Sequence, residues 1–123
     1  MSGVSYLLDT NVILGMLKSN PEVMAMVSSM GLMSKQCAYS AITRMELLGY
    51  PGITTDEDSL IRQRLAKLTY LAITTEIEDK AIDLRRARRV KLPDALIAST
   101  AMIHGLTLLT MDIGLQAVVR SAV

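Results

Sequence analysis

Short apolar runs alternate with longer segments of helical periodicity along the 123-residue chain. The first run, residues 4–8, predicts a buried strand, and a polar step at residues 9–11 separates it from a helix over Val12–Lys18. Three more runs predict strands at residues 35–40, 70–73 and 106–109. The segments between them predict helices over Pro21–Met30, Ala41–Gly49, Asp58–Leu68, Thr75–Lys91 and Pro93–His104. Strands that alternate with helices indicate an α/β domain with a mostly parallel sheet.

Proline, glycine and capping residues set the limits of these helices. Pro21 and Pro93 stand in first turns, where proline is tolerated, and Gly105 ends the last helix. Thr75 and Glu78 have the spacing of a capping box. Residues 54–58 predict a polar loop, and a short tail is expected after residue 109. We see no linker or repeat, so residues 1–123 predict one domain.

Composition narrows the classes of function. Half of the residues are apolar, and a net charge of +1 does not by itself indicate a nucleic-acid binder. The single cysteine, Cys37, excludes an internal disulfide and a cysteine-based zinc site. The single histidine, His104, sits at a predicted helix end, which disfavours a Ser-His or Cys-His catalytic pair. The chain shows neither a membrane-length apolar run nor a basic leader, so we expect a soluble cytoplasmic protein.

Four of the twelve acidic residues stand alone in apolar sequence, namely Asp9, Glu46, Asp94 and Asp112. Burying an uncompensated carboxylate costs several kcal/mol, so such residues are capped, paired or bound to a cation. Asp9 and Asp112 follow predicted strands, and the other two lie on helices that begin at the same edge of the sheet. Because ligands bind beyond the carboxyl ends of parallel strands, we expect the four to converge. An all-oxygen cluster favours Mg²⁺ or Mn²⁺.

Each acid also has a purely structural interpretation. Asp9 suits a helix N-cap, Asp94 complements a helix dipole, and Asp112 suits a turn. Glu46 is compatible with a solvated helix surface. It is the joint pattern that favours one shared site.

Four segments resemble, in order, the motifs of PIN domains. They are residues 7–14 (LLDTNVIL), 40–47 (SAITRMEL), 91–101 (KLPDALIASTA) and 105–112 (GLTLLTMD). The likeness extends over almost the whole chain, and its length and Leu-Pro-Asp-Ala sequence especially resemble the toxins of VapBC toxin–antitoxin pairs. The resemblance implies a three-layer α/β/α sandwich and Mg²⁺- or Mn²⁺-dependent cleavage of RNA. It also implies a homodimer and an antitoxin partner of the VapB kind.

The resemblance assigns roles residue by residue. Asp9, Glu46 and Asp94 match the metal-binding acids of the family, and a second set matches its supporting polar positions: Thr10, Asn11 and Thr110. Many members carry a further acid and then an aromatic at the positions held here by Leu115 and Gln116. Asp112 is then the only candidate for a fourth acid. Whether its carboxylate reaches the site decides between a site for one metal ion and a site for two.

Basic residues suggest a path for the RNA backbone. Five lie within seven positions, ending three residues before Asp94: Arg85, Arg86, Arg88, Arg89 and Lys91. On a continuous helix, Arg85, Arg88 and Arg89 share one face and form a phosphate track. The alternative is a solvated helix face paired with Glu78, Asp79 and Asp83. Arg44, two residues from Glu46, is a further candidate phosphate contact.

A groove for an antitoxin helix is predicted from apolar residues that crowd the first two helices. These are Met16, Leu17, Met24, Met26, Val27, Met30, Leu32 and Met33. Core packing is the alternative use for several of them.

Two other functional classes stay open. A phosphatase of the haloacid-dehalogenase type also begins with a strand and an aspartate, but it needs a second acid where this chain has Asn11. It also needs a downstream catalytic lysine that we do not find. A non-catalytic PIN domain that acts as a binding module is the second alternative, because of the acid missing at Leu115.

Overall fold

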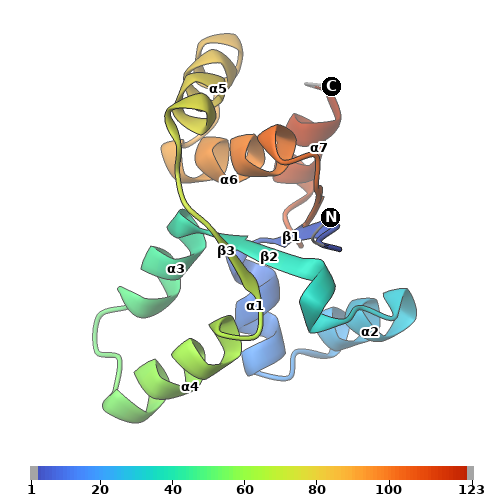
Figure 1. Ribbon diagram of the computed structural model, residues 1–123, viewed down its shortest axis with the longest axis vertical. Helices are drawn as coiled ribbons and strands as arrows, with labels where there is room; N and C mark the ends of the chain where they lie inside the picture. Colours follow the sequence, from blue (N-terminus) through green and yellow to red (C-terminus); the bar gives the residue numbers. More distant parts are fainter. Residues whose placement is uncertain (1–2, 122–123) are drawn as a thin grey trace.

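A four-stranded parallel sheet forms the centre of the computed structural model, which describes residues 3–121 (Figure 1). The strand order is β3-β2-β1-β4. The strands are β1 (Tyr6–Leu8), β2 (Cys37–Ser40), β3 (Thr69–Leu71) and β4 (Thr107–Leu109). Leu7 of β1 pairs with Ala38 on one side and with Leu108 on the other. Parallel neighbours need crossovers, and helices supply them here.

Helices cover both faces of this sheet. The elements are α1 (Thr10–Leu17), α2 (Pro21–Met30), α3 (Ala41–Leu48), α4 (Thr55–Leu65), α5 (Thr75–Ala87), α6 (Leu92–Ile103) and α7 (Ile113–Ser121), with a 3-10 turn at Ser34–Gln36. In Figure 1, α1 to α4 lie below the sheet and α5 to α7 above it. The predicted three-layer α/β/α sandwich is therefore confirmed. None of the described helices is long and apolar enough to cross a membrane.

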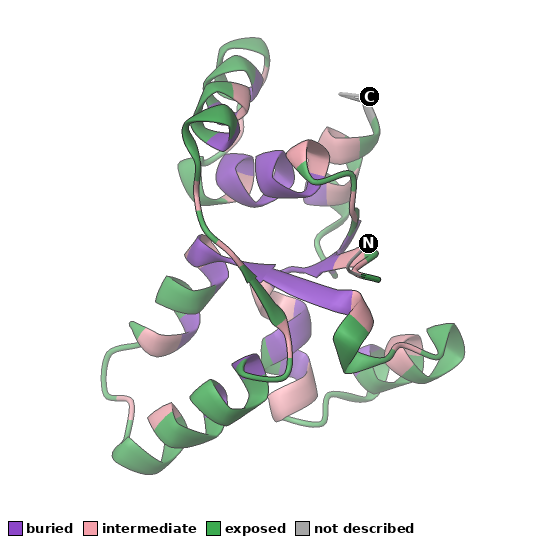
Figure 2. Cartoon of the chain, viewed as in Figure 1, coloured by how far each residue is buried: buried purple, intermediate pink, exposed green. Residues whose placement is uncertain are grey.

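Alternate residues of the strands supply two separate cores. Leu8 and Leu109 pack with the apolar residues of α1, α2, α3 and α4. Their neighbours Leu7 and Leu108 point to the opposite face, where α5, α6 and α7 cover them. Successive strand residues face opposite sides, so a short run that is apolar throughout fills both layers. Figure 2 shows the buried strand β2 between helices with exposed outer faces, whereas the edge strand β3 is largely exposed.

Gly15 permits close packing of α1 against α2. A Cβ at this position would lie 2.5 Å from Cγ2 of Val23, which is too near for any side chain. Val23 is itself 3% exposed, so the contact belongs to the core.

The N-terminal boundary of α4 and the cap of α5 differ from the sequence predictions, and a threonine caps the helix in each case. Residues 54–58 are not a loop: the Thr54 hydroxyl accepts from the Glu57 amide, and the Glu57 carboxylate accepts from the Thr54 amide, so α4 begins at Thr55. The expected Thr75–Glu78 box is wrong, because Thr74 caps α5 through the Ile77 amide. At α5 the capping residue is thus one position before the predicted one, and at α4 the helix begins three residues earlier than predicted.

The C-terminal ends of two predicted segments also differ. The helix predicted to reach Lys91 stops at Ala87, where Arg88 turns to an extended conformation (φ −147°, ψ 161°). The expected tail after β4 contains the helix α7, whose first turn is held by Asp112: its Oδ1 accepts from the Leu115 amide over 3.2 Å. Leu115 is 2% exposed in the upper core, which gives this helix its anchor.

Candidate active site

The carboxyl edge of the sheet gathers polar residues from three neighbouring strands. Asp9 follows β1, Ser40 ends β2 and Thr110 follows β4. All three are buried, with exposed fractions of 6% or less. Buried polar groups need partners, and these residues find them in one another and in the helices that start beside them.

Asp9 has a donor on each carboxylate oxygen. Its Oδ1 accepts from the Thr10 amide over 2.7 Å, which makes it the N-cap of α1. Its Oδ2 accepts from the Thr110 hydroxyl over 2.6 Å. The capping and site interpretations of Asp9 are therefore compatible, since each oxygen keeps a lone pair for a further ligand.

Thr110 connects Asp9 with the opposite side of the site. Its hydroxyl oxygen accepts from Asn11 Nδ2 over 3.4 Å and from the Asp112 amide over 3.0 Å. Asn11 Oδ1 in turn accepts from the Met111 amide over 3.1 Å. The predicted supporting residues Asn11 and Thr110 thus join the start of α1 to the segment between β4 and α7.

Glu46 lies on α3 and reaches the site through Thr10. The Thr10 hydroxyl and Glu46 Oε1 are 2.6 Å apart, and Thr10 Oγ1 is 3.0 Å from Thr43 Oγ1. Glu46 is exposed, whereas Thr43 is completely buried. Sequence reasoning did not single out Thr43 or its partner Ser40. A signal was present, because Ser40 caps α3 through the Thr43 amide and a serine or threonine with this spacing precedes many helices.

The pKa of Asp94 responds to the charges of the other three acids. It stands in the first turn of α6 and is half-buried. Desolvation raises the pKa of its carboxyl, and the charges of Asp9, Asp112 and Glu46 raise it further, against a small opposing effect of Lys91. Like charges act in this way only at short range. Asp9, Glu46 and Asp112 are therefore each near enough to Asp94 for their charges to act on its carboxyl.

The donor set suits a hard cation without forming a closed cage. Within residues 3–121, no three Asp, Glu, His or Cys side chains already stand at the spacing of a metal site. Mg²⁺ keeps several water ligands and commonly takes only one or two carboxylates. The free lone pairs of Asp9 and the mutual repulsion at Asp94 both fit such an ion.

Asp112 occupies a different position from the other acids. It is exposed, and its Oδ1 is used to cap α7. The predicted turn role is thus correct for Oδ1, which caps α7. The charge of Asp112 also raises the pKa of Asp94, so its carboxylate lies near that residue. Leu115, at the position where the resemblance led us to expect a further acid, is buried in the core and contributes no ligand.

Comparison with known proteins decides the family. The family model for the PIN domain matches residues 6–120. The chain belongs to the PIN domain family. No curated protein sequence matches it significantly.

Solved structures resemble this PIN domain over most of its length. A chain of a toxin-antitoxin complex from Klebsiella pneumoniae is 29% identical, with 88% of this chain and 87% of that chain covered and a TM-score of 0.76. FitAcB from Neisseria gonorrhoeae is 27% identical, with 94% and 93% covered and a TM-score of 0.76. VapBC2 from Rickettsia felis, bound to a promoter DNA fragment, is 22% identical, with 89% of each chain covered and a TM-score of 0.73, and shows the common fold.

The basic residues of the PIN domain do not form the predicted continuous track. Because α5 ends at Ala87, Arg88 and Arg89 leave the helix and do not share a face with Arg85. They are also not paired with acids, since the only ion pair within residues 3–121 joins Arg62 to Asp58. Lys91 lies near enough to Asp94 to oppose the rise in its pKa.

Arg44 stands on the exposed side of α3. Burial raises the pKa of the Tyr39 hydroxyl, and the charge of Arg44 opposes that rise, which places the guanidinium near the end of β2. Neither Arg44 nor Lys91 forms an ion pair within residues 3–121.

The apolar residues of the first two helices divide between core and surface. Several pack partly buried against the lower core: Met16, Leu17, Met26, Val27 and Leu32. Met24, Met30 and Met33 keep 42%, 40% and 52% of their surface exposed. Of the predicted set, these three keep the most exposed apolar surface, and the groove itself stays a prediction.

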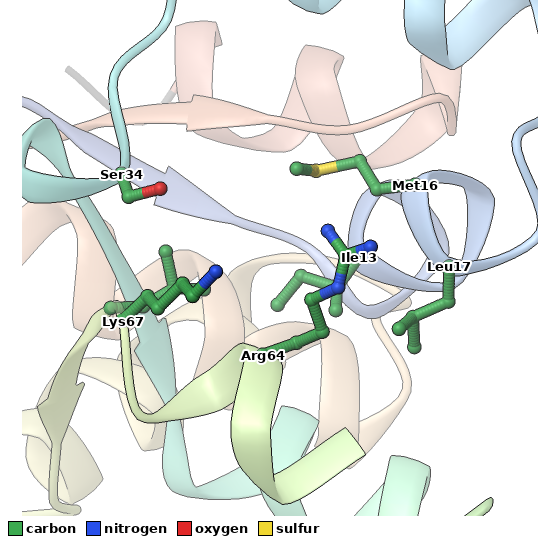
Figure 3. Close-up of a pocket in the computed structure, with 7 residues that line it drawn as sticks. Ile13, Met16, Leu17, Ser34, Arg64 and Lys67 are labelled. Atoms are coloured by element: carbon green, nitrogen blue, oxygen red, sulfur yellow. The ribbon is translucent and has the colours of Figure 1, made fainter. Parts of the chain in front are cut away.

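Two hollows mark the α1–α4 side of the PIN domain. A cavity of about 220 Å³ borders Thr10 and Glu46 and is lined further by apolar residues of α1, α3 and α4. A second, of about 90 Å³, lies between α1 and the end of α4. In Figure 3, the Arg64 and Lys67 side chains reach toward the same space as Met16.

Proposed function

We propose that this PIN domain is a metal-dependent endoribonuclease and the toxin of a toxin–antitoxin pair. One observation supports the activity most strongly: the carboxyl of half-buried Asp94 has a raised pKa, because burial desolvates it and because the charges of Asp9, Asp112 and Glu46 act on it. Such mutual repulsion is costly without a cation. Two structural neighbours above 25% identity, of which one is described as a toxin-antitoxin complex, support the biological role.

Three residues would hold Mg²⁺ or Mn²⁺: Asp9, Glu46 and Asp94. Asp112 would contribute a fourth carboxylate through the oxygen that does not cap α7. A bound ion of this kind lowers the pKa of a coordinated water and polarises the scissile phosphate. Thr110 and the Thr10 amide keep the Asp9 carboxylate in one orientation. That fixed geometry is what positions a ligand in a small open site.

Hydrolysis needs no protein nucleophile in this arrangement. Water attacks phosphorus in line with the leaving ribose oxygen, the P–O bond to that oxygen breaks, and a proton passes to the leaving group. Glu46, which the Thr10 hydroxyl holds, is placed to orient the attacking water. The exposed position of Glu46 leaves room for water and substrate at that side.

RNA is the proposed substrate, bound through its phosphates. Lys91 lies near Asp94, and the further candidate phosphate contacts are Arg44, Arg85, Arg88 and Arg89. Aromatic side chains for base stacking are few, since the chain has four tyrosines and neither phenylalanine nor tryptophan. Recognition therefore depends mainly on backbone charge and RNA shape.

A VapB-like antitoxin and a second copy of the chain are the proposed protein partners. Met24, Met30 and Met33 expose adaptable apolar surface on α2 and just after it, and the separate 220 Å³ cavity beside Glu46 has apolar lining residues. Light scattering tests both partners. A monomer that gains no mass with the product of the neighbouring gene contradicts them.

A non-catalytic binding module is the second candidate, favoured by the burial of Leu115 in place of a further acid. Incubation of the pure protein with end-labelled RNA and Mn²⁺, with and without EDTA, separates the two. We expect discrete cleavage products that EDTA abolishes. Retarded but intact RNA would support the binding module.

A further inference from the structure

We infer that Ser40, Thr43 and Thr10 form a one-way chain of hydroxyl groups that ends on Glu46, with Thr43 as a positioning residue for that carboxylate. The catalytic consequence rests on the proposed function, whereas the chain itself is a property of the fold. Each of the three hydroxyl groups has one proton to donate, and this sets the direction of the chain.

The first step is the contact between Thr10 and Glu46. An ionised carboxylate only accepts hydrogen bonds, so the Thr10 hydroxyl donates across the 2.6 Å to Glu46 Oε1. A hydroxyl has one proton. Thr10 therefore has none left for Thr43, and at its second contact it acts as the acceptor.

The second step fixes the direction at Thr43. Because Thr10 accepts, the Thr43 hydroxyl donates across the 3.0 Å between the two Oγ1 atoms. The proton of Thr43 is then committed, so the 3.4 Å contact with Ser40 Oγ is donated by Ser40. Ser40 Oγ meanwhile accepts from the Thr43 amide over 3.2 Å. Every hydroxyl dipole thus points toward Glu46.

Burial makes this direction stable. Ser40 and Thr43 are both completely buried, so neither hydroxyl has water as an alternative partner. Hydrogen bonds in such a chain polarise one another, and the effect is larger where the dielectric constant is low. The exposed Glu46 carboxylate is therefore held from inside the protein, through Thr10 of a different helix.

Thr43 is the link that can be tested most directly. Thr43→Val keeps the shape of the side chain and leaves Thr10 without a donor. Thr100 provides a matched control: it is 1% exposed on α6, and its hydroxyl donates to the Leu96 carbonyl of its own helix. Thr100→Val therefore makes the same chemical change outside the chain of hydroxyls.

The structural test uses urea unfolding and does not depend on activity. Thr43→Val and Thr100→Val are each measured in the natural background and in a Glu46→Ala background. We expect Thr43→Val to shift the urea midpoint less in Glu46→Ala than in the natural chain, because the carboxylate that polarises the hydroxyls is gone. Thr100→Val should shift the urea midpoint by the same amount in both backgrounds. An equal shift of the urea midpoint by Thr43→Val in both backgrounds would overturn the inference.

The functional test uses RNA cleavage and binding of Mn²⁺ alone. Thr43→Val should lower kcat about tenfold with little change in KM for RNA, and should weaken Mn²⁺ binding, within the ~10–100-fold range typical of residues behind a metal ligand. Thr43→Ser should restore both. Natural kcat and Mn²⁺ affinity in Thr43→Val, or no recovery in Thr43→Ser, would refute the positioning role. A natural chain that shows the urea coupling but cleaves no RNA would instead refute the proposed function and leave the chain of hydroxyls standing.

Discussion

Thr110 donates its hydroxyl proton to Oδ2 of Asp9 across 2.6 Å, although 101 positions separate the two residues in the chain. The bond joins the ends of β4 and β1, which are neighbours in the sheet. The same hydroxyl oxygen accepts from Asn11 and from the Asp112 amide. One buried threonine therefore joins residues from two of the four motifs, the first and the last, that first suggested a common site.

Thr110→Val is expected to destabilise the protein and to impair the site together. Valine keeps the branched shape, but it removes the donor to Asp9 and leaves that buried carboxylate short of one partner. Loss of a buried hydrogen bond to a charged group costs about 1.5–3 kcal/mol. Urea unfolding measures this cost. Thr107→Val, on the exposed first residue of β4, is the control and should stay within about 0.5 kcal/mol of the natural chain.

Asp94→Asn is expected to change how stability depends on pH. The pKa of Asp94 is raised by desolvation and by the nearby acids, so the folded state holds this proton more tightly than the unfolded chain does. That contribution is full below the unfolded value of about 4 and is lost as the pH rises through the higher folded pKa. In EDTA, the stability of Asp94→Asn relative to that of the natural chain should therefore increase as the pH rises from 4 to 7.

Unfolding curves at several pH values check this prediction. A stability difference that stays constant, or that shrinks with rising pH, would contradict it. Excess Mn²⁺ at pH 7 should make the natural chain more stable than Asp94→Asn, because an ion that binds only the folded natural site stabilises the folded state by mass action.

Asp112 is expected to have two separable roles. Asp112→Ala removes the cap of α7 and the charge, and should cost about 0.5–2 kcal/mol of stability. Asp112→Ser keeps a capping oxygen and should fold almost as well as the natural chain. If the carboxylate also serves the site, both variants lose cleavage activity by about 10–100-fold. Normal cleavage by Asp112→Ser would reduce Asp112 to a capping residue.

Lys91→Gln is expected to weaken RNA binding without affecting the reaction itself. Lys91 is exposed and lies near Asp94. Loss of one phosphate contact should lower the slope of log affinity against log salt by about 0.7 for single-stranded RNA. A salt series of RNA binding in EDTA measures the slope. Lys35→Gln, on the 3-10 turn, is the control, and an unchanged slope in Lys91→Gln would remove this residue from the substrate path.

The sequence predicted the layers of the fold because strand runs and proline- or glycine-marked helices carry strong local signals. It missed α7, whose anchor Leu115 is recognisable only once the upper core exists to receive it. It extended α5 over Arg88 and Arg89 because arginine is a good helix former, and nothing local showed that the chain turns toward α6 there.

The candidate site divides in the same way. Asp9, Glu46, Asp94 and Asp112 stood out because charge is rare in apolar sequence. Thr43 is a threonine among many, and its role depends on Thr10, a residue 33 positions away that only the fold brings to it. Contacts of that kind carry no local pattern.

The most direct test of the central claim is a Mn²⁺ titration of RNA cleavage by the natural chain, Asp9→Asn, Asp94→Asn and the surface control Asp83→Asn. Asp83 is exposed on α5, away from the four carboxylates. We predict saturable, EDTA-sensitive cleavage by the natural chain and by Asp83→Asn, and none by the two site variants. Metal-dependent cleavage that persists in Asp9→Asn or Asp94→Asn would contradict the account.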